Sequence, residues 1–223
     1  PYGFHGIHGR ALPISTGVRL RRPDLAIFVV MGDGDCCSIG AGHWIHAIRY
    51  NTHMTALLLD NNIYGLTKNQ TSPTTPQGYT SNTQPEGSFL PALDPISATL
   101  GVTNASFVAQ TATLKAAQRH RGFSFVRILQ RCPIWTPDIF QQAAQSLELT
   151  ELLVHPDGIV EPDVEALYPN HVPHDPKDIV AARSVASAKD KIRLGLFFLD
   201  RDAPCYDETR QVPLCTAEEK IET

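Results

Sequence analysis

The feature that most constrains the fold is an apolar run that ends in a glycine-rich acidic turn. Residues 25–31 read LAIFVVM, and the turn Gly32-Asp33-Gly34-Asp35 follows directly. Seven apolar residues rich in strand-forming types predict a strand covered on both faces, as in a parallel sheet. The chain should therefore be an α/β protein.

The next segments complete a strand–helix–strand unit. Residues 39–50 are predicted to form a helix whose apolar stripe consists of Ala41, Trp44, Ile45 and Ile48. Residues 55–59 form a second apolar run, followed by Asp60-Asn61-Asn62. A right-handed crossover would make the two strands parallel. Asp33 and Asn61 should then meet at the sheet edge where open α/β sheets bind ligands.

The rest of the chain continues this alternation. Further strands are predicted at residues 106–109, 123–129 and 192–199, and helices at 113–121 and 178–191. Cys132 then falls just beyond a strand, on the same edge. Residues 66–93, rich in Thr, Pro, Gln and Ser, have no period and are interpreted as a loop over a site or against a partner. We expect one domain over residues 1–200 and a polar tail over 201–223.

Composition excludes several classes of protein. The 223 residues include 23 acidic and 19 basic side chains, a net charge of −4 that gives no footprint for nucleic acid. The longest apolar runs are far shorter than the roughly 20 residues of a membrane span. The sequence shows no secretory leader, and its five cysteines have no disulfide-framework spacing. We therefore expect a cytoplasmic protein.

The two turns carry ligand chemistry. The Asp33 carboxylate and the Asn61 amide oxygen are hard ligands suited to Mg²⁺. Gly32 and Gly34 would let the backbone approach a diphosphate, which a following helix N-terminus favours. The alternative is a glycine-rich turn in which Asn61 has only a local turn role, and these residues alone leave both open.

The motifs resemble those of a known family. Residues 32–34, then 26 intervening residues, then Asn61-Asn62 resemble the thiamine diphosphate signature. Residues 8–76, and more thinly 122–133, resemble the β subunit of 2-oxoacid:ferredoxin oxidoreductases. The resemblance implies a thiamine diphosphate-binding fold, a mostly parallel sheet with helices on both faces, with thiamine diphosphate and Mg²⁺ as cofactors.

The resemblance also implies roles for single residues. Mg²⁺ would be bound by Asp33, Asn61 and the backbone carbonyl of Ile63. The cofactor-binding residues would be Gly32, Asp33, Gly34, Asp35, Asn61, Ile63, Gly65, Leu66 and Thr67. The catalytic residues would be Leu66 near the substrate, Lys68 and His8, which belongs to a His8-Gly9-Arg10 turn.

A [4Fe-4S] cluster is implied as well. Cys132, in the dipeptide Cys132-Pro133, would supply one ligand. The family takes the other three from a segment upstream of the His8 turn, and we expect that segment to be missing from this sequence.

The implied reaction is CoA-dependent oxidative decarboxylation of a 2-oxoacid to acyl-CoA and CO₂, with electrons passing through the cluster to ferredoxin. The substrate would be 2-oxoglutarate, with pyruvate next. An α subunit carrying the pyrimidine-type domain would be the partner. The alternatives are a non-catalytic scaffold subunit and a cluster-free thiamine diphosphate decarboxylase in which Cys132 is a core thiol.

Three other features have plainer interpretations. His43 and His46 lie three residues apart on a helix, but a surface or interface face is favoured over a metal site. Cys36 and Cys37 are better interpreted as buried small apolar residues than as a redox pair. Asn69 stands where the family has glycine, a departure that bears on the local backbone shape.

Overall fold

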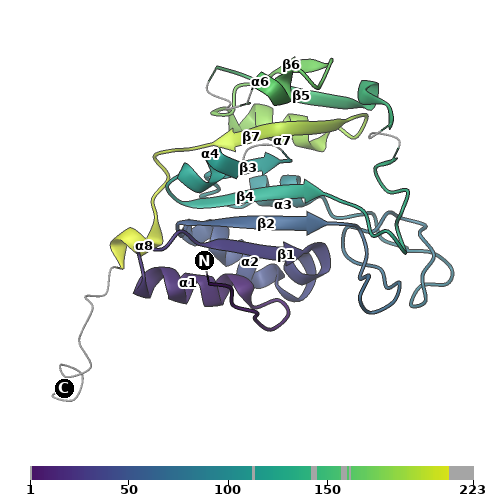
Figure 1. Ribbon diagram of the computed structural model, residues 1–223, viewed down its shortest axis with the longest axis horizontal. Coiled ribbons are helices and arrows are strands. Elements are labelled where there is room, and N and C mark those ends of the chain that lie inside the picture. Colours follow the sequence, from purple (N-terminus) through teal and green to yellow (C-terminus); the bar gives the residue numbers. More distant parts are fainter. Residues whose placement is uncertain (1, 112–113, 142–144, 157–159, 161, 211–223) are drawn as a thin grey trace.

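The computed structural model describes residues 2–111, 114–141, 145–156, 160 and 162–210. Within them, seven strands form one sheet in the order β1-β2-β4-β3-β7-β5-β6 (Figure 1). The strands are β1 (Phe28–Gly32), β2 (Met54–Asp60), β3 (Phe107–Gln110), β4 (Phe123–Leu129), β5 (Thr150–Val154), β6 (His171–Pro173) and β7 (Ile192–Leu199). The helices are α1 (Ala11–Arg21), α2 (Ala41–Tyr50), α3 (Pro95–Gly101), α4 (Leu114–Arg119), α6 (Pro162–Glu165), α7 (Ile179–Ser187) and α8 (Tyr206–Thr209), with a π-helical turn η1 (Asp35–Ile39) and a 3₁₀ turn η2 (Leu147–Leu149).

The sheet is mostly parallel, as predicted. Strand β2 lies between β1 and β4 and runs parallel to both. Among the strand pairs of the described residues, only β3–β7 is antiparallel. Gly32 at the end of β1 is paired with Leu59, which is in turn paired with Ile128 of β4. The carboxyl ends of these three strands are therefore level, and the segments that follow them start side by side.

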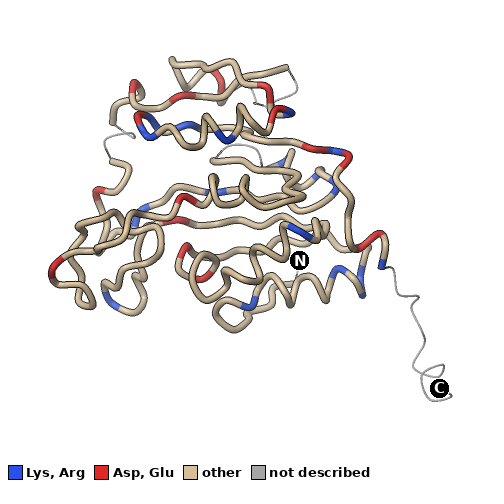
Figure 2. Tube along the Cα trace, turned by 180° about the vertical axis from the view of Figure 1, so that it is seen from behind, with Lys and Arg blue, Asp and Glu red and all other residues tan. Residues whose placement is uncertain are grey.

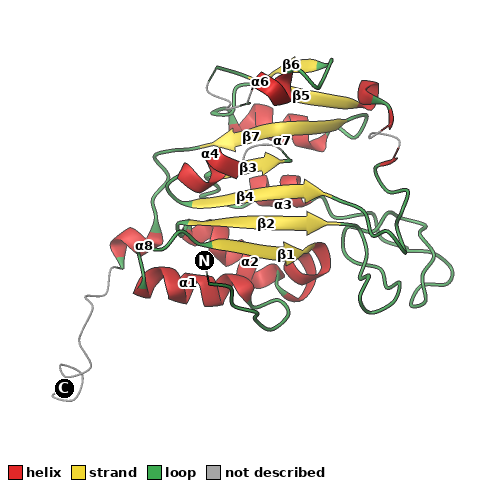
Figure 3. Cartoon of the chain, viewed as in Figure 1, coloured by secondary structure: helices red, strands yellow, loops and turns green. Residues whose placement is uncertain are grey.

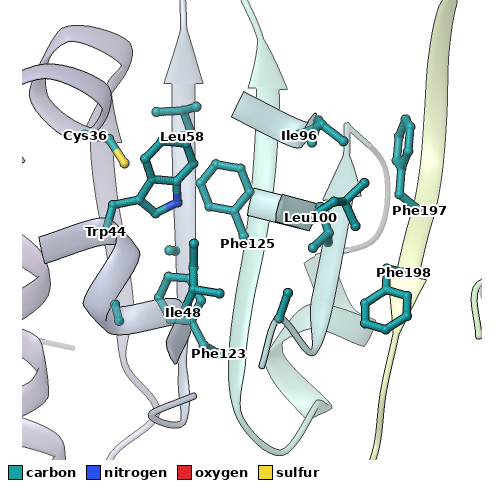
Figure 4. Close-up of a cluster of buried hydrophobic side chains, with 14 of the residues drawn as sticks. Cys36, Trp44, Ile48, Leu58, Ile96, Leu100, Phe123, Phe125, Phe197 and Phe198 are labelled. Atoms are coloured by element: carbon teal, nitrogen blue, oxygen red, sulfur yellow. The ribbon is translucent and has the colours of Figure 1, made fainter. Parts of the chain in front are cut away.

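Helices cover both faces, and the two faces are covered unequally (Figure 3). On one face, α1, α2, α3 and α7 share a large apolar core with the strands. Trp44 of α2 stacks on Phe125 of β4 there, with ring centroids 5.4 Å apart (Figure 4). On the other face, α4 packs Ala116 and Ala117 against Val126 and its neighbours. The expectation of helices on both faces is confirmed.

Strand β1 differs from its prediction. It starts at Phe28 rather than at residue 25, and Leu25 is 40% exposed. Phe28 and Val30 are 48% and 58% exposed, so this strand is not covered on both faces. The reason is position: β1 is the edge strand, and α4 packs over β2 and β4.

The first crossover helix also differs in detail. The helical backbone begins with η1, and α2 continues from Ala41. Its buried residues are Trp44, Ala47 and Ile48, while Ile45 is 44% exposed. The predicted apolar stripe was wrong at Ile45. The side of α2 that contacts α1 and the sheet contains Trp44, Ala47 and Ile48, at positions i, i+3 and i+4.

The later elements that were predicted are present, some with shifted ends. Helices α3, α6 and α8 and strands β5 and β6 were not predicted from the sequence. β2, β3, β4 and β7 form at the predicted places. Helix α7 ends at Ser187, not at residue 191, and Asp178 caps its start by accepting from two backbone N–H groups. Helix α4 starts at Leu114, and the predicted first residue, Thr113, lies outside the described residues. Residues 66–93 contain no helix or named strand, as expected of a loop.

The segment expected to be a polar tail begins with packed residues. Ala203, Cys205 and Asp207 are buried, and Asp207 forms an ion pair with Arg19 at 2.8 Å. Residues 211–223 lie outside the described residues. Because these residues pack against the rest of the domain, the fold continues past the predicted boundary at residue 200.

The surface carries charges of both signs. Figure 2 shows Lys and Arg interspersed with Asp and Glu along the described part of the trace. None of the helices described here has the length and apolar character that crossing a lipid bilayer requires.

Candidate functional site

The candidate site lies where β1, β2 and β4 end, among the loops beyond their arrowheads in Figure 1. Asp33 follows β1, Asn61 follows β2 and Cys132 lies shortly after β4. Because Gly32, Leu59 and Ile128 are level in the sheet, all three segments leave from one edge. The predicted convergence of these residues at this edge is confirmed.

Asp33 is the centre of a buried hydroxyl cluster. Its side chain is 2% exposed, and its Oδ2 accepts hydrogen bonds from the hydroxyls of Ser72 and, at 2.8 Å, Thr74. The Thr74 hydroxyl is also 2.8 Å from Oδ1 of Asp60. Burial raises the pKa of Asp33 above its ordinary value; the Ser72 hydroxyl opposes that shift and the charge of Asp60 adds to it.

The two carboxylates of this cluster have different partners. Asp60 is fully buried and is paired with Arg127, whose Nε and second terminal nitrogen lie 2.7 Å and 2.6 Å from Oδ2. Among the described residues, no basic side chain forms an ion pair with Asp33. A buried carboxylate without a cation is costly. The position of Asp33 is therefore suited to a bound metal ion.

The turn after β2 presents oxygen atoms at the same edge. The side-chain oxygen of Asn61 accepts from the backbone N–H of Ile63 at 3.2 Å. Asn62 has a φ of +60°, donates from Nδ2 to the carbonyl of Thr74, and leaves its Oδ1 buried without a hydrogen-bond partner. Buried unpartnered oxygens are rare in proteins, and here one lies next to the proposed metal ligands.

A tyrosine ties the two ligand loops together. The hydroxyl of Tyr64 donates to the carbonyl of Gly34 at 2.9 Å. A Cβ atom at Gly34 would lie 2.1 Å from the Tyr64 ring, so no side chain fits there. The second glycine of the motif is thus required by close packing between the loops. The same turn leads into the helical backbone of η1, and the N–H groups at the start of a helix generally suit an anion.

Asp35 joins the N-terminal turn to the site. Its Oδ1 lies 3.0 Å from Nδ1 of His8 and also accepts from the backbone N–H of Gly9. Gly9 has a φ of +74°, and a Cβ there would be 2.5 Å from Ile39. Asp35 therefore positions His8, whose side chain remains 53% exposed at the edge of the site.

The loop after Gly65 is the most exposed part of the site. Leu66 is 98% exposed, and Thr67 and Lys68 are exposed as well. Lys68 and Asn69 have φ values of +67° and +61°. Asparagine adopts this left-handed conformation more readily than most residues. Asn69 therefore keeps a backbone shape that glycine would also allow.

Cys132 lies against the metal-ligand turn. It is a half-buried free cysteine, and a Cβ at Gly65 would be 3.2 Å from its sulfur. Its backbone N–H donates to the Thr136 hydroxyl at 3.0 Å, and that hydroxyl donates to the carbonyl of Asn61 at 2.9 Å. One residue, Thr136, thus links the proposed cluster ligand to the proposed Mg²⁺ ligand.

Two other pairs were singled out in the sequence. His43 contacts Arg10 at 2.8 Å, and within the described residues no three His, Cys, Asp or Glu side chains are grouped as a metal site. Cys36 and Cys37 are buried, and contact with Cys37 together with burial raises the pKa of the Cys36 thiol. These contacts favour the interpretations as a surface histidine and as buried small apolar residues.

Sequence reasoning missed Ser72, Thr74, Asp60 and Arg127. The sequence shows four hydroxyl residues around Pro73, at positions 71, 72, 74 and 75, but nothing in their spacing shows that this segment folds back over Asp33. Asp60 ends a strand and Arg127 lies in another, and their pairing depends on the register between β2 and β4. These are long-range contacts that local patterns do not report.

Comparison with known proteins adds a family to this geometry. Residues 1–128 match the thiamine pyrophosphate enzyme family, C-terminal TPP-binding domain. A 2-oxoglutarate oxidoreductase subunit, KorB, of Mycobacterium tuberculosis is 48% identical over 148 residues, which are 62% of this chain and 39% of that protein. The β subunit of a 2-oxoacid:ferredoxin oxidoreductase from a Sulfolobus species is 34% identical over 217 residues, which are 92% of this chain and 68% of that protein.

A solved structure agrees with these relatives. The 2-oxoglutarate:ferredoxin oxidoreductase of Magnetococcus marinus, with 2-oxoglutarate, coenzyme A and succinyl-CoA bound, superposes with a TM-score of 0.75 at 33% identity. The match covers 96% of this chain and 72% of that one. The chain thus spans well under half of one relative and about two thirds of others. Taken with the fold, these similarities show that the chain belongs to the thiamine diphosphate-binding β subunits of the 2-oxoacid:ferredoxin oxidoreductases.

Proposed function

We propose that the chain provides the thiamine diphosphate site of a cytoplasmic complex that oxidatively decarboxylates a 2-oxoacid to acyl-CoA and CO₂. The observation that carries this proposal is Asp33, a buried carboxylate with no cationic partner among the described residues, beside a turn of oxygen ligands. The free state of the four described cysteines is in keeping with a reducing compartment.

The residues present fit Mg²⁺ and a diphosphate. Asp33, Asn61 and the backbone carbonyl of Ile63 would hold the metal, and Gly32 and Gly34 would allow the close approach of phosphate oxygens. Bound thiamine diphosphate supplies a centre that stabilises a carbanion. The chain's own part is to orient that cofactor through the metal and through the start of η1.

Electron transfer would pass through Cys132. We assign it as one ligand of a [4Fe-4S] cluster whose other ligands come from outside the described residues, with ferredoxin as acceptor. The position of the Cys132 sulfur, 3.2 Å from where a Cβ of residue 65 would lie, and its link through Thr136 to Asn61 support a cluster close to the cofactor. A short path favours transfer of electrons from the site.

A second subunit is needed to complete this site. Leu66 and Phe89 are 98% and 72% exposed at this edge, more than isolated core-forming residues would be. Such exposure supports coverage by an α subunit carrying the pyrimidine-type domain. His8, Leu66 and Lys68 would then be enclosed with the substrate, and the charge of Lys68 suits a carboxylate.

The proposed substrate is 2-oxoglutarate, with pyruvate next. The Mycobacterium relative and the Magnetococcus structure both carry 2-oxoglutarate in their names. These names support 2-oxoglutarate as the first choice.

The test is reduction of a viologen dye by the purified, assembled complex under anaerobic conditions, with a panel of 2-oxoacids with and without CoA. We expect reduction that requires both CoA and 2-oxoglutarate. Asp33→Ala should lower this rate by about a thousandfold, because a lost metal ligand removes cofactor orientation.

The alternatives predict different results. Unchanged dye reduction in the Asp33→Ala complex would mean that this chain is a scaffold subunit. CO₂ release without dye reduction, in a complex that contains no iron, would indicate the cluster-free decarboxylase.

A further inference from the structure

Two buried hydroxyl residues donate hydrogen bonds to Asp33, the proposed metal ligand. Both hydroxyl donors of the Asp33 cluster, Ser72 and Thr74, contact the same carboxylate oxygen, Oδ2. Neither contacts Oδ1. Ser72 is 8% exposed and Thr74 is fully buried, so bulk water does not compete for these bonds. The carboxylate therefore has one oxygen occupied and one left for another ligand.

The single proton of the Thr74 hydroxyl has a preferred acceptor. That hydroxyl lies 2.8 Å from both Asp33 and Asp60, but it can donate to only one of them. Asp60 is already satisfied by Arg127 at Oδ2 and by the backbone N–H of Asn62, at 3.2 Å, at Oδ1. Asp33 has no such ion pair within the described residues. The Thr74 proton is thus available to Asp33, and the Asp60–Arg127 pair maintains that direction.

We infer, on the basis of the proposed function, that Ser72 and Thr74 are positioning residues that select Mg²⁺ over Ca²⁺ at this site. With Oδ2 engaged by two hydroxyls, Asp33 would offer a metal one oxygen rather than two. Mg²⁺ requires near-octahedral geometry with few protein ligands, whereas Ca²⁺ accepts bidentate carboxylates and more ligands. A carboxylate restricted to one oxygen favours the smaller ion.

The substitution that tests this inference is Thr74→Val, which removes the hydroxyl and keeps the shape. The readout is the dissociation constants of Mg²⁺ and of Ca²⁺, measured by titration calorimetry on the assembled complex saturated with thiamine diphosphate. We expect the Mg²⁺ affinity to fall about tenfold, the usual range for a residue that orients a metal ligand. The Ca²⁺ affinity should change much less, so the preference for Mg²⁺ shrinks. Thr74→Ser, which restores a hydroxyl, should restore the preference.

Thr99→Val is the matched control. Thr99 is also buried, but its hydroxyl donates to the carbonyl of Pro95 in α3 and not to Asp33. This variant should keep the preference for Mg²⁺ even if both affinities fall together. If Thr74→Val prevents assembly, Ser72→Ala removes the other donor to Oδ2 and should shift the preference in the same direction.

The outcomes separate this inference from the proposed function. If Asp33→Asn abolishes Mg²⁺ binding while Thr74→Val and Ser72→Ala keep the wild-type ratio of the two affinities, the selectivity role is wrong and the metal site stands. If Asp33→Asn binds Mg²⁺ as the wild type does, the metal site itself is wrong.

Discussion

A buried polar cluster lies at each end of the strands, along the amino-terminal and the carboxyl-terminal edge of the sheet. The two clusters differ in how many of their polar groups have hydrogen-bond or ion-pair partners. At the amino-terminal edge, Oδ1 of Asn51 accepts from the Ser106 hydroxyl at 2.6 Å and from the backbone N–H of Phe123 at 2.7 Å. His120 contacts the same hydroxyl at 2.9 Å. At the carboxyl-terminal edge, Asp33 has no cationic partner among the described residues, and Asn62 has an unpartnered oxygen.

This difference separates a structural cluster from a binding one. Fully satisfied buried networks rigidify a fold, whereas unpaired groups cost free energy unless a ligand meets them. The amide of Asn51 also donates to the carbonyls of Ala203 and Pro204, which fastens the segment after β7 to the sheet. Substitutions at the first edge should therefore change stability, and those at the second should change ligand binding.

The largest effect on stability is expected for Asn51→Ala. The change would leave several buried groups without partners, and the free energy of unfolding should fall by about 3 kcal/mol or more. Urea-induced unfolding of the purified chain measures this free energy. Asn104→Ala is the matched control, because Asn104 also has positive φ and donates to the Pro204 carbonyl, at 3.0 Å, but is more exposed. It should cost about 1 kcal/mol. Equal losses in the two variants would contradict the special role of the buried cluster.

The same buried cluster should make the free energy of unfolding depend on pH, through His120. Burial lowers its pKa from 6.5 to about 4 in the folded protein. As the pH falls below 6.5, the unfolded chain binds a proton that the folded chain does not. Stability is therefore complete above pH 6.5 and is lost between there and pH 4, by about 3 kcal/mol from this group. Unfolding free energies across that range, in the wild type and in His120→Gln, should show a shallower loss in the variant. Identical slopes would refute the assignment.

The smallest effect is expected at the binding edge, for Tyr64→Phe. The change removes one hydrogen bond between the two ligand loops, the one to Gly34. Stability should fall by only about 1 kcal/mol. The affinity for thiamine diphosphate with Mg²⁺ should fall by severalfold, because the loops are less well held together. Tyr79→Phe, whose hydroxyl contacts Asn69 and the Trp135 carbonyl, is the comparison, and it should affect cofactor affinity less. A larger loss of cofactor affinity in Tyr79→Phe than in Tyr64→Phe would argue against a role for Tyr64 in joining the loops.

Much of the fold could be predicted because its signals are local. The alternation of apolar runs and helical periods correctly placed β2, β3, β4 and β7, and the parallel pairing of β1 with β2. The errors occurred where burial depends on neighbours. Val30 was expected to be covered and is exposed, because β1 is at the edge of the sheet. Ile45 was expected to face the core, but the helix is rotated toward Ala47.

The candidate site, like the fold, could be predicted only in part. Asp33 and Asn61 could be brought together from their sequence positions, since parallel strands end at one edge. The roles of Leu66, Lys68 and His8 remain predictions. All three side chains are exposed at this edge of the sheet.

The sequence by itself determined the α/β class and the meeting of the two ligand turns, because strand and helix periods and crossover handedness are local or nearly universal rules. Only the tertiary structure decided that Ser72 and Thr74 lie over Asp33 and that Arg127 neutralises Asp60. The physical reason is that these contacts join a loop without periodicity, and residues of two different strands, to one carboxylate cluster. Their positions depend on the register of the sheet and the path of the loop, which no short stretch of sequence records.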